Sequence, residues 1–535
     1  MSINRILADL LTATALAGSS SALVMMLKRD LMMLQQNSYR YGRFRTWMSQ
    51  SGESTTMPRL VAVMIILLGL STFASAMLTA ILTAVYGVWV SLDLWRRKYK
   101  KPLVFTSRAT RIFILSLLLA FAVSAAGFVA GYNGMRAAAR SAAVWLTGCC
   151  AVSYVFVIAA NWLLTPVQRL IDRGYRRDAE RILASMPGLK VIGITGSYGK
   201  TSTKHFLHAI LSEQYSTVMT PGNYNTTLGV ILTVRNHLKP YTEVFIVEMG
   251  AKQKGDIEDI CNLVHPSTGI ITAVGPQHLE SFGTLENVRD TKFELADAIP
   301  ASGLVVLNND FPMTASREVN NCRALRYAID NQDPADYHVT DILYSPSGTT
   351  FTIRSAGEEI ITLHTQLLGS ANISDLTAAV IVALDMGLSH EQIRYAVERI
   401  TPVEHRLSIK RTASGVTLLD DAYNSNPVGS AMALDVLSQM RGGRRIVITP
   451  GMIELGVDQE RLNREFGRKI ASSVDIAVVV GNYNRESIVG GISEGEGKPE
   501  VKIVDTFAEG QQYLNTIMRP GDTILYENDL PDTFK

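Results

Sequence analysis

The chain has 535 residues, of which 47% are hydrophobic and 19% are charged, and it contains four cysteines. This composition excludes a disordered, collagen-like or disulfide-stapled protein. The net charge of +2 conceals two unlike parts. Residues 1–185 carry 21 Lys or Arg and 7 Asp or Glu, whereas the remainder carries 30 and 42. A basic, apolar first part and an acidic second part indicate a membrane region joined to a cytoplasmic one.

Four apolar segments of the first part are long enough to cross a membrane as helices, which takes about 20 residues. They are residues 6–27, 60–92, 112–132 and 142–165. The first contains Asp9 and a polar run at 18–21, so a helix lying on the membrane surface is the alternative. The second is long enough to predict a tilted helix. Lys and Arg clusters at 96–111 and 169–181 favour the cytoplasmic side, although four spans leave the basic loop 28–59 outside.

The second part begins with a strand, a glycine loop and a helix. The strand is expected at 191–195 and the helix ends near residue 211, with Gly196-Ser197-Tyr198-Gly199-Lys200-Thr201-Ser202 between them. The amides of such a loop and the helix N-terminus bind phosphate oxygens. Lys200 would reach the outer phosphates, and the Thr201 hydroxyl would hold Mg²⁺. The strict phosphate-loop pattern is not met, because Ile194 stands where it requires its first glycine, so a simple glycine turn is the alternative.

Further motifs follow the loop in order: a strand ending in Glu248, a strand leading to His278, and a helical segment with Lys292 and Glu294. At these residues the chain resembles the Mur ligases, the ATP-dependent amide-bond ligases of peptidoglycan synthesis. Within that family it is most similar to the branch that adds D-alanyl-D-alanine to a UDP-linked muramyl tripeptide. The resemblance covers about residues 188–525.

This resemblance implies a site for ATP and two Mg²⁺ ions. Glu248 and His278 match ligands of the second ion, and Lys292 matches a lysine that is carbamoylated so that it helps to hold that ion. The implied metal-binding residues are Thr201, Glu248, His278 and Lys292. Taken singly, a glutamate at a strand end, a loop histidine and a helix lysine each have an ordinary structural explanation.

The last third of the chain supplies further matches. Asn372 resembles the asparagine that contacts adenine, although Ala371 and Asp375 stand where the family usually has His and Asn. Arg406 would face the nucleotide phosphates. Asp421 would lie near the ribose and Asn424 near the reacting centre, unless their segment is only a polar turn. The implied nucleotide-binding set is Gly196, Ser197, Gly199, Lys200, Thr201, Ser202, Asn372, Arg406 and Asp421, and the catalytic set is Lys200, Glu248, His278, Lys292 and Asn424.

The expected architecture has three parts. Residues 1–185 form an α-helical transmembrane region with a basic linker. Residues 186–401 form an α/β, P-loop ATPase domain with a mostly parallel sheet, and residues 402–535 form a Rossmann-like α/β domain. Two departures from the family stand out. The domain that holds the UDP end of the substrate is replaced by the membrane region, and residues 527–532 are acidic where the family often has basic residues.

The sequence therefore predicts a multi-pass ligase of the bacterial inner membrane with cytoplasmic catalytic domains. It would activate a muramyl peptide carboxylate as an acyl phosphate and join it to an amino acid or dipeptide, by default D-alanyl-D-alanine. The substrate would be UDP-linked, with the helices as a tether, or lipid-linked, with the helices and membrane lipid at the substrate site. No nucleic-acid partner is expected. The alternatives are a polymer-forming ligase such as a poly-γ-glutamate synthase, and a non-catalytic ATP-binding membrane scaffold.

Overall fold

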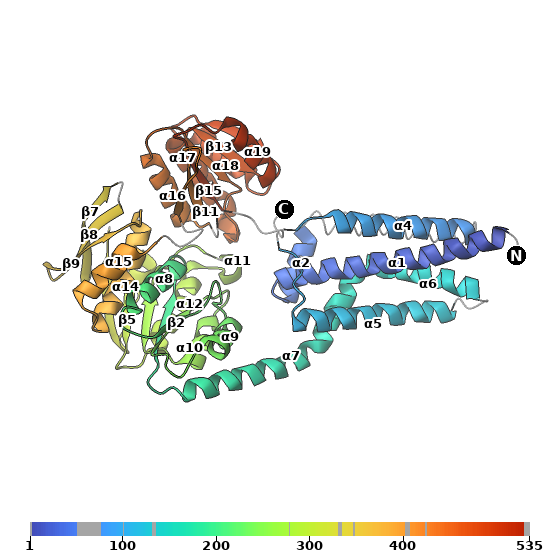
Figure 1. Ribbon diagram of the computed structural model, residues 1–535, viewed down its shortest axis with the longest axis horizontal. Helices are drawn as coiled ribbons and strands as arrows, with labels where there is room; N and C mark the ends of the chain where they lie inside the picture. The colour runs from blue at the N-terminus through green and yellow to red at the C-terminus, as the bar shows by residue number, and fades with distance from the viewer. Residues whose placement is uncertain are drawn as a thin grey trace. The chain divides into compact units, whose positions relative to one another are not determined.

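The computed structural model describes residues 3–50, 76–99, 101–130, 135–277, 279–329, 334–345, 348–401, 407–422 and 425–528 (Figure 1). The chain divides into two compact units. One is built mainly on the residues up to Asp172, and the other comprises Arg173–Asp529. The first unit is helical and the second contains two β-sheets.

The helical unit contains α1 (Ile3–Gln36), α2 (Tyr41–Gln50), α4 (Ala76–Arg96), α5 (Ser107–Ala130), α6 (Met135–Ala151) and the start of α7 (Ser153–Ala184). Among the described residues, four helices are long and apolar enough to cross a membrane: Ile6–Gln36, Met77–Arg96, Ser107–Ala130 and Ser153–Ala184. The predicted segment 6–27 lies within α1. The predicted segment 112–132 lies within α5 as far as Ala130. The predicted segment 60–92 lies in α4 from Ala76 onward, and its first part lies outside the described residues.

The predicted single helix over 142–165 is wrong, because the structure divides this segment between α6 and α7. The Val152 amide donates to the Cys149 carbonyl at 3.3 Å, which is three residues earlier and not the four of an α-helix. The Ser153 hydroxyl donates to the Asp30 carboxylate of α1. The helix therefore ends and restarts at Val152, and the fourth apolar helix begins at Ser153.

The polar run at 18–21 in α1 makes contacts with neighbouring helices. A Cβ atom added to Gly87 of α4 would lie 2.2 Å from the Gly18 carbonyl carbon, so the two backbones touch. The Ser19 hydroxyl bonds the Thr147 hydroxyl of α6 at 3.1 Å. Small residues allow such close helix packing, and hydroxyl pairs join helices in apolar surroundings. Through this run, α1 therefore packs against α4 and α6.

The larger sheet of the second unit has nine strands in the order β2-β3-β1-β4-β5-β6-β7-β8-β9. Neighbouring strands from β2 to β7 in this order are parallel, whereas β8 is antiparallel to β7 and β9 is antiparallel to β8. The strands are β1 (Lys190–Thr195), β2 (Thr217–Met219), β3 (Val244–Glu248), β4 (Thr268–Ile271), β5 (Leu304–Asn308), β6 (Arg323–Ala328), β7 (Tyr337–Ser345), β8 (Gly348–Ser355) and β9 (Glu358–Thr365). The central strands are short, apolar and buried, as parallel strands covered on both faces must be.

Helices cover both faces of this sheet. One apolar core forms against α8 (Lys200–Leu211), α14 (Ser370–Asp385) and α15 (His390–Arg399). The other forms against α9 (Thr227–His237), α10 (Asp256–Val264) and α12 (Leu285–Ala298). The short helices α11 (Leu279–Phe282) and α13 (Pro312–Ala315) complete this part.

The second sheet has six strands in the order β10-β11-β15-β12-β13-β14, of which only the β10 edge is antiparallel. Its strands are β10 (Ser408–Arg411), β11 (Thr417–Asp421), β12 (Arg445–Thr449), β13 (Ile476–Val480), β14 (Glu500–Val504) and β15 (Thr523–Glu527), with helices α16 (Pro427–Gln439), α17 (Gln459–Ser473), α18 (Arg485–Glu494) and α19 (Phe507–Ile517) and the single turn η1 (Gly456–Asp458). The prediction of an α/β protein with parallel sheets behind a helical region is confirmed.

Candidate functional site

The candidate site lies where β1, β3 and β4 end. These strands are adjacent and parallel in the sheet, so their carboxyl ends meet at one edge. The glycine loop leaves β1 there, and Glu248, the last residue of β3, pairs with Ile194 of β1. Open α/β sheets bind their ligands at this edge.

Both glycines of the loop are required by the backbone. Gly196 has a φ angle of +153°, and a Cβ atom there would lie 2.1 Å from the Thr272 hydroxyl. Gly199 has a φ angle of +78°, and a Cβ atom there would lie 2.1 Å from an Asp375 carboxylate oxygen. Gly199 caps α8, which begins at Lys200, so the N-terminus of a twelve-residue helix faces the loop. Such a terminus favours an anion.

Ser197 and Lys200 of the loop differ in their roles. The buried Ser197 hydroxyl donates to the Gly275 carbonyl at 2.9 Å and accepts from the Gly275 amide at 3.1 Å, so it fixes the loop against the residues after β4. The Lys200 ammonium group donates to the Gly196 carbonyl at 2.6 Å and to the Ser197 carbonyl at 3.3 Å. Lys200 thus lies over its own loop, whereas Ser202 is buried in α8.

Glu248 is the electrostatic centre of the site. One of its oxygens accepts from the Thr201 hydroxyl at 3.1 Å and lies 2.9 Å from the Lys204 ammonium group, and the other accepts from the Asn225 amide at 3.1 Å. The residue is 2% exposed. Burial acts to raise the pKa of Glu248, but the charges of Lys204 and Lys200 outweigh it and hold the pKa below its ordinary value. Glu248 is therefore an ionised carboxylate at neutral pH.

Lys204 and Asn225 are partners of Glu248 that the sequence analysis missed. Lys204 is fully buried and also donates to the Gly222 carbonyl at 2.7 Å. The available signal was spacing: Lys204 follows Lys200 by four positions and therefore lies on the same face of α8. Asn225 carries no such signal, because an asparagine in a polar loop is commonplace.

Lys292 of α12 is buried, and it lies near enough to Lys200 for the two charges to interact. Burial, together with the nearby charge of Lys200, holds the pKa of Lys292 well below its ordinary value. Within the described residues, no hydrogen bond or ion pair holds its ammonium group. Glu294 instead has a structural role, since its carboxylate accepts from the Gly255, Ile257 and Glu258 amides at 2.7, 3.2 and 3.0 Å and so caps α10.

The remaining predicted residues are placed as follows. Asn372 is buried in α14, where its amide donates to the Leu368 carbonyl at 2.9 Å. Asp421 ends β11, and its carboxylate accepts from the Leu407 amide at 3.1 Å. His278, Arg406 and Asn424 lie outside the described residues.

Glu527 is a buried acid that the sequence analysis did not single out. It ends β15 directly opposite Asp421, and it accepts hydrogen bonds from the Ser425 and Ser430 hydroxyls at 2.7 and 2.8 Å. Burial and the charge of Asp421 raise the pKa of Glu527 to about 8. This residue is therefore mostly protonated at neutral pH and does not contribute to an acidic surface.

The oxygen donors at the sheet edge suit a hard cation such as Mg²⁺, which takes carboxylate and hydroxyl oxygens. Glu248 is ionised, and Thr201 lies beside it. Within the described part of the chain, no three His, Cys, Asp or Glu side chains gather around one point. A metal site here would therefore combine Glu248 with donors of other kinds.

Comparisons with known proteins agree with this geometry. Residues 194–383 match the Mur ligase middle domain, and residues 405–526 match the Mur ligase, glutamate ligase domain. A UDP-N-acetylmuramoyl-tripeptide–D-alanyl-D-alanine ligase of Mycobacterium bovis is 34% identical over 63% of this chain and 70% of its own length. The ligase of the same name from Bacillus subtilis is 29% identical over 69% and 78%. The crystal structure of MurF from Acinetobacter baumannii superposes with a TM-score of 0.60 at 26% identity, over 66% of this chain and 77% of that one.

The chain belongs to the Mur ligase family, whose members are ATP-dependent, ADP-forming ligases that use Mg²⁺. Within this family its neighbours are ligases of the MurF type, which act in peptidoglycan synthesis. The comparisons favour neither the poly-γ-glutamate synthase nor the non-catalytic scaffold.

Proposed function

We propose that this protein is a membrane-anchored ligase of the MurF type. It joins the peptide carboxylate of a muramyl tripeptide to D-alanyl-D-alanine at the cytoplasmic face of a bacterial inner membrane. The observation that carries the ligase assignment is the arrangement around Glu248, where an ionised, buried carboxylate meets Thr201 and Lys204 beside the glycine loop. The four apolar helices support the membrane location.

The chemistry follows from the charges that must be brought together. Amide formation from a carboxylate is unfavourable, so the peptide carboxylate first takes the γ-phosphoryl group of ATP, and ADP leaves. Two anions meet in this step. Lys200 and the loop amides bind the phosphate oxygens and lower that repulsion. The amine of the dipeptide then attacks the acyl carbon, the amide bond forms, phosphate leaves, and the amine loses its proton.

The metal would be held by Glu248 and Thr201, with His278 and Lys292 as the further ligands implied by the family resemblance. Bound Mg²⁺ supplies positive charge where the carboxylate and the phosphoryl group meet. The role of this chain's residues is to hold that charge in place. Lys204 keeps Glu248 ionised and oriented, because it shares the oxygen that accepts from Thr201.

Lys292 fits the proposed carbamoylation. Its lowered pKa leaves a share of the amine neutral near neutral pH, and a neutral amine adds CO₂ by forming a nitrogen–carbon bond and releasing a proton. The resulting carbamate is an anion. It replaces repulsion between the charges of Lys292 and Lys200 by attraction, so the neighbouring charge that disfavours the ammonium form supports the modified one.

The nucleotide contacts of Asn372, Arg406 and Asp421, the role of Asn424 and the presence of two metal ions remain proposals that rest on the family resemblance. The muramyl substrate is linked either to UDP or to a lipid, and the helical region bears most directly on this choice.

The test uses the full chain purified in nanodiscs and measures ATP-dependent phosphate release together with product mass. UDP-muramyl tripeptide and its lipid-linked counterpart are offered separately, each with D-alanyl-D-alanine. Turnover with the UDP form alone makes the helices a tether, and turnover with the lipid form alone places them at the substrate. Lack of product with both contradicts the proposed dipeptide ligase. ATP binding without acceptor-dependent release would then support the scaffold.

A further inference from the structure

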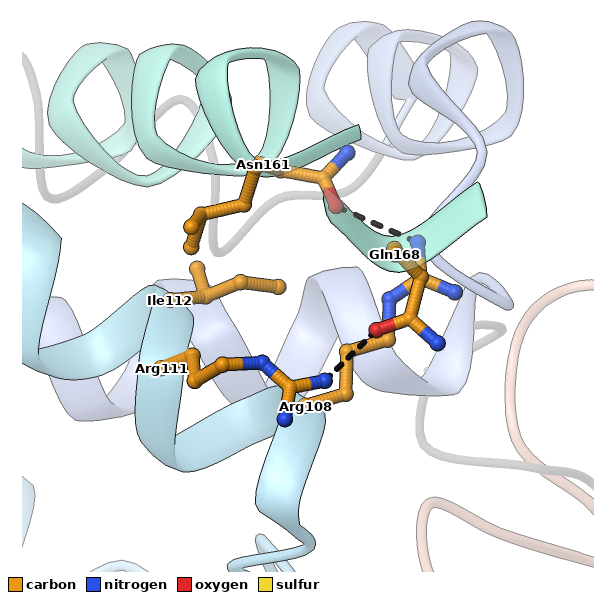
Figure 2. Close-up of a pocket in the computed structure, with 6 residues that line it drawn as sticks. Arg108, Arg111, Ile112, Asn161 and Gln168 are labelled. Carbon is orange, nitrogen blue, oxygen red and sulfur yellow. Dashed lines mark hydrogen bonds between the residues drawn. The ribbon is translucent and has the colours of Figure 1, made fainter. Parts of the chain in front are cut away.

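The helical unit contains a small basic pocket at the start of α5, beside the middle of α7. Arg108 and Arg111 of α5 line it together with residues of α7, and it is partly open to solvent (Figure 2). The full lining is Arg108, Arg111, Ile112, Asn161, Leu164 and Gln168. The pocket is separate from the sheet edge described above and belongs wholly to the helical unit.

The two guanidinium groups are held by neutral partners. Arg108 donates to the Asn161 amide oxygen at 3.3 Å, and Arg111 donates to the Gln168 amide oxygen at 2.7 Å. Arg108 also lies 4.1 Å from the centre of the Tyr39 ring. Among the described residues neither arginine forms a salt bridge. These contacts fix the direction of both groups without neutralising their charge.

The carboxylate closest in sequence to the pocket residues is Asp172, which Gln168 engages through its amide nitrogen at 2.7 Å. Gln168 thus donates to a carboxylate on one side and accepts from Arg111 on the other, while the charge of Asp172 acts on Arg108. The pocket keeps an excess of positive charge.

The place of the arginines in α5 adds to this excess. Both lie near the N-terminus of a 24-residue helix, and the first turn contains no acidic residue. The helix dipole disfavours cations at that end and favours anions. Two arginines here are unfavourable for the helix alone, and an anion bound between them removes the conflict.

The rest of the lining is apolar. Ile112 is buried and Leu164 is half-buried. Next to Asn161, α7 exposes large apolar side chains, including Trp162, which is 73% exposed. A ligand that fits such a site carries a phosphate at one end and a hydrocarbon chain at the other.

We propose that this pocket binds the phosphate group of an anionic membrane lipid, held by Arg108 and Arg111, with the hydrocarbon chain along the exposed apolar side chains of α7. The planar guanidinium group suits phosphate oxygens because it presents paired N–H donors. The inference rests on the proposed membrane location of these helices and is independent of the ligase reaction.

The test measures lipid retention by the full chain. The protein is delipidated in detergent, titrated with phosphatidylglycerol or phosphatidylcholine, and weighed by native mass spectrometry. The unmodified protein is expected to retain one phosphatidylglycerol with at least a tenfold preference over phosphatidylcholine. Arg108→Gln combined with Arg111→Gln is expected to abolish that preference. If the double variant does not elute as a single species, either single variant suffices, with an expected several-fold loss.

The matched control is Arg169→Gln combined with Arg173→Gln. It removes the same charge from exposed positions of α7 and is expected to retain the preference. An equal loss in both double variants would indicate diffuse attraction to basic residues and would overturn the proposal. So would a full preference in the Arg108 and Arg111 variant.

A second arm separates a lipid phosphate from a free one. Inorganic pyrophosphate is added to the delipidated protein without lipid. Little or no retention is expected, because pyrophosphate has no hydrocarbon chain to contact the exposed apolar side chains of α7. Retention of pyrophosphate as tight as that of the lipid, with the same dependence on Arg108 and Arg111, would overturn the lipid source. Because no arm measures ligation, failure here leaves the proposed ligase function untouched.

Discussion

The ammonium group of Lys204 lies 2.9 Å from the carboxylate of Glu248, and both side chains are removed from solvent. Lys200, one turn earlier in α8, instead lies over the carbonyl groups of its own loop. The two lysines therefore have different functions. Lys204 holds the carboxylate at the strand end, and Lys200 is available to a bound polyphosphate.

Lys204→Met is expected to lower the free energy of unfolding by about 3–5 kcal/mol, because it leaves the Glu248 carboxylate buried without its charge partner. Lys200→Met is the matched control. It should change stability by less than about 1 kcal/mol, since Lys200 is only partly buried, and still abolish phosphate release. Thermal unfolding of the full chain and the ligation assay measure the two effects. Equal stability loss in both variants would contradict the division of roles.

Gly199→Ala is expected to impair the glycine loop. The residue has a left-handed backbone, which costs a residue with a side chain about 1–2 kcal/mol, and the added methyl group would collide with Asp375. ATP binding, followed with a fluorescent nucleotide analogue, should weaken at least tenfold. Gly188→Ala is the control, because a Cβ atom there meets nothing within 4 Å. Unchanged affinity in the Gly199 variant would show that the loop does not bind the nucleotide.

Lys292→Ala is expected to lower ligation by about two orders of magnitude, the scale on which a group that stabilises developing charge acts. In the unmodified protein, activity should fall when dissolved CO₂ and bicarbonate are removed and return when bicarbonate is added. Glu294→Gln, which alters the cap of α10 and removes a carboxylate whose charge raises the pKa of Lys292, should keep this response. Mass spectrometry under CO₂ provides a direct measurement. Activity that ignores bicarbonate would exclude the carbamate.

Glu527 gives a prediction on pH. Its pKa is raised from 4.5 to about 8 in the folded protein, so between these values the folded state keeps a proton that the unfolded state has lost. The contribution of Glu527 to stability is therefore full at low pH and is lost as the pH rises to about 8, by at most about 1.4 kcal/mol per pH unit. Glu527→Gln, which is always neutral, should show a flatter unfolding profile between pH 5 and 8. An identical slope in both proteins would refute the shift.

The sequence was informative wherever local chemistry carries the signal. The loop from Gly196 to Thr201 and the strand ending in Glu248 have patterns that few other structures share, and the sheet edge where they meet follows from parallel topology. Lys204 was missed because a lysine in a helix is normally solvated, and only tertiary contacts reveal its burial. Glu527 was misjudged for the same reason: its charge was inferred from residue type, whereas its environment removes that charge.

The helical part shows the same limit. Apolar length located the helices but did not reveal the break at Val152, beside which Ser153 donates to Asp30 of α1. Mean hydropathy describes one segment of consecutive residues and contains no information about a contact with another helix.

The contact between Gly18 and Gly87 bears on whether the helical region is exchangeable. A helix that serves only as a membrane anchor can be replaced by any apolar helix of sufficient length, because lipid does not distinguish one apolar sequence from another. A pair of backbones that touch cannot, since a single methyl group at Gly87 forces them apart. The packing of α1 against α4 is thus specified at this position, and a foreign helix of equal length would not reproduce it.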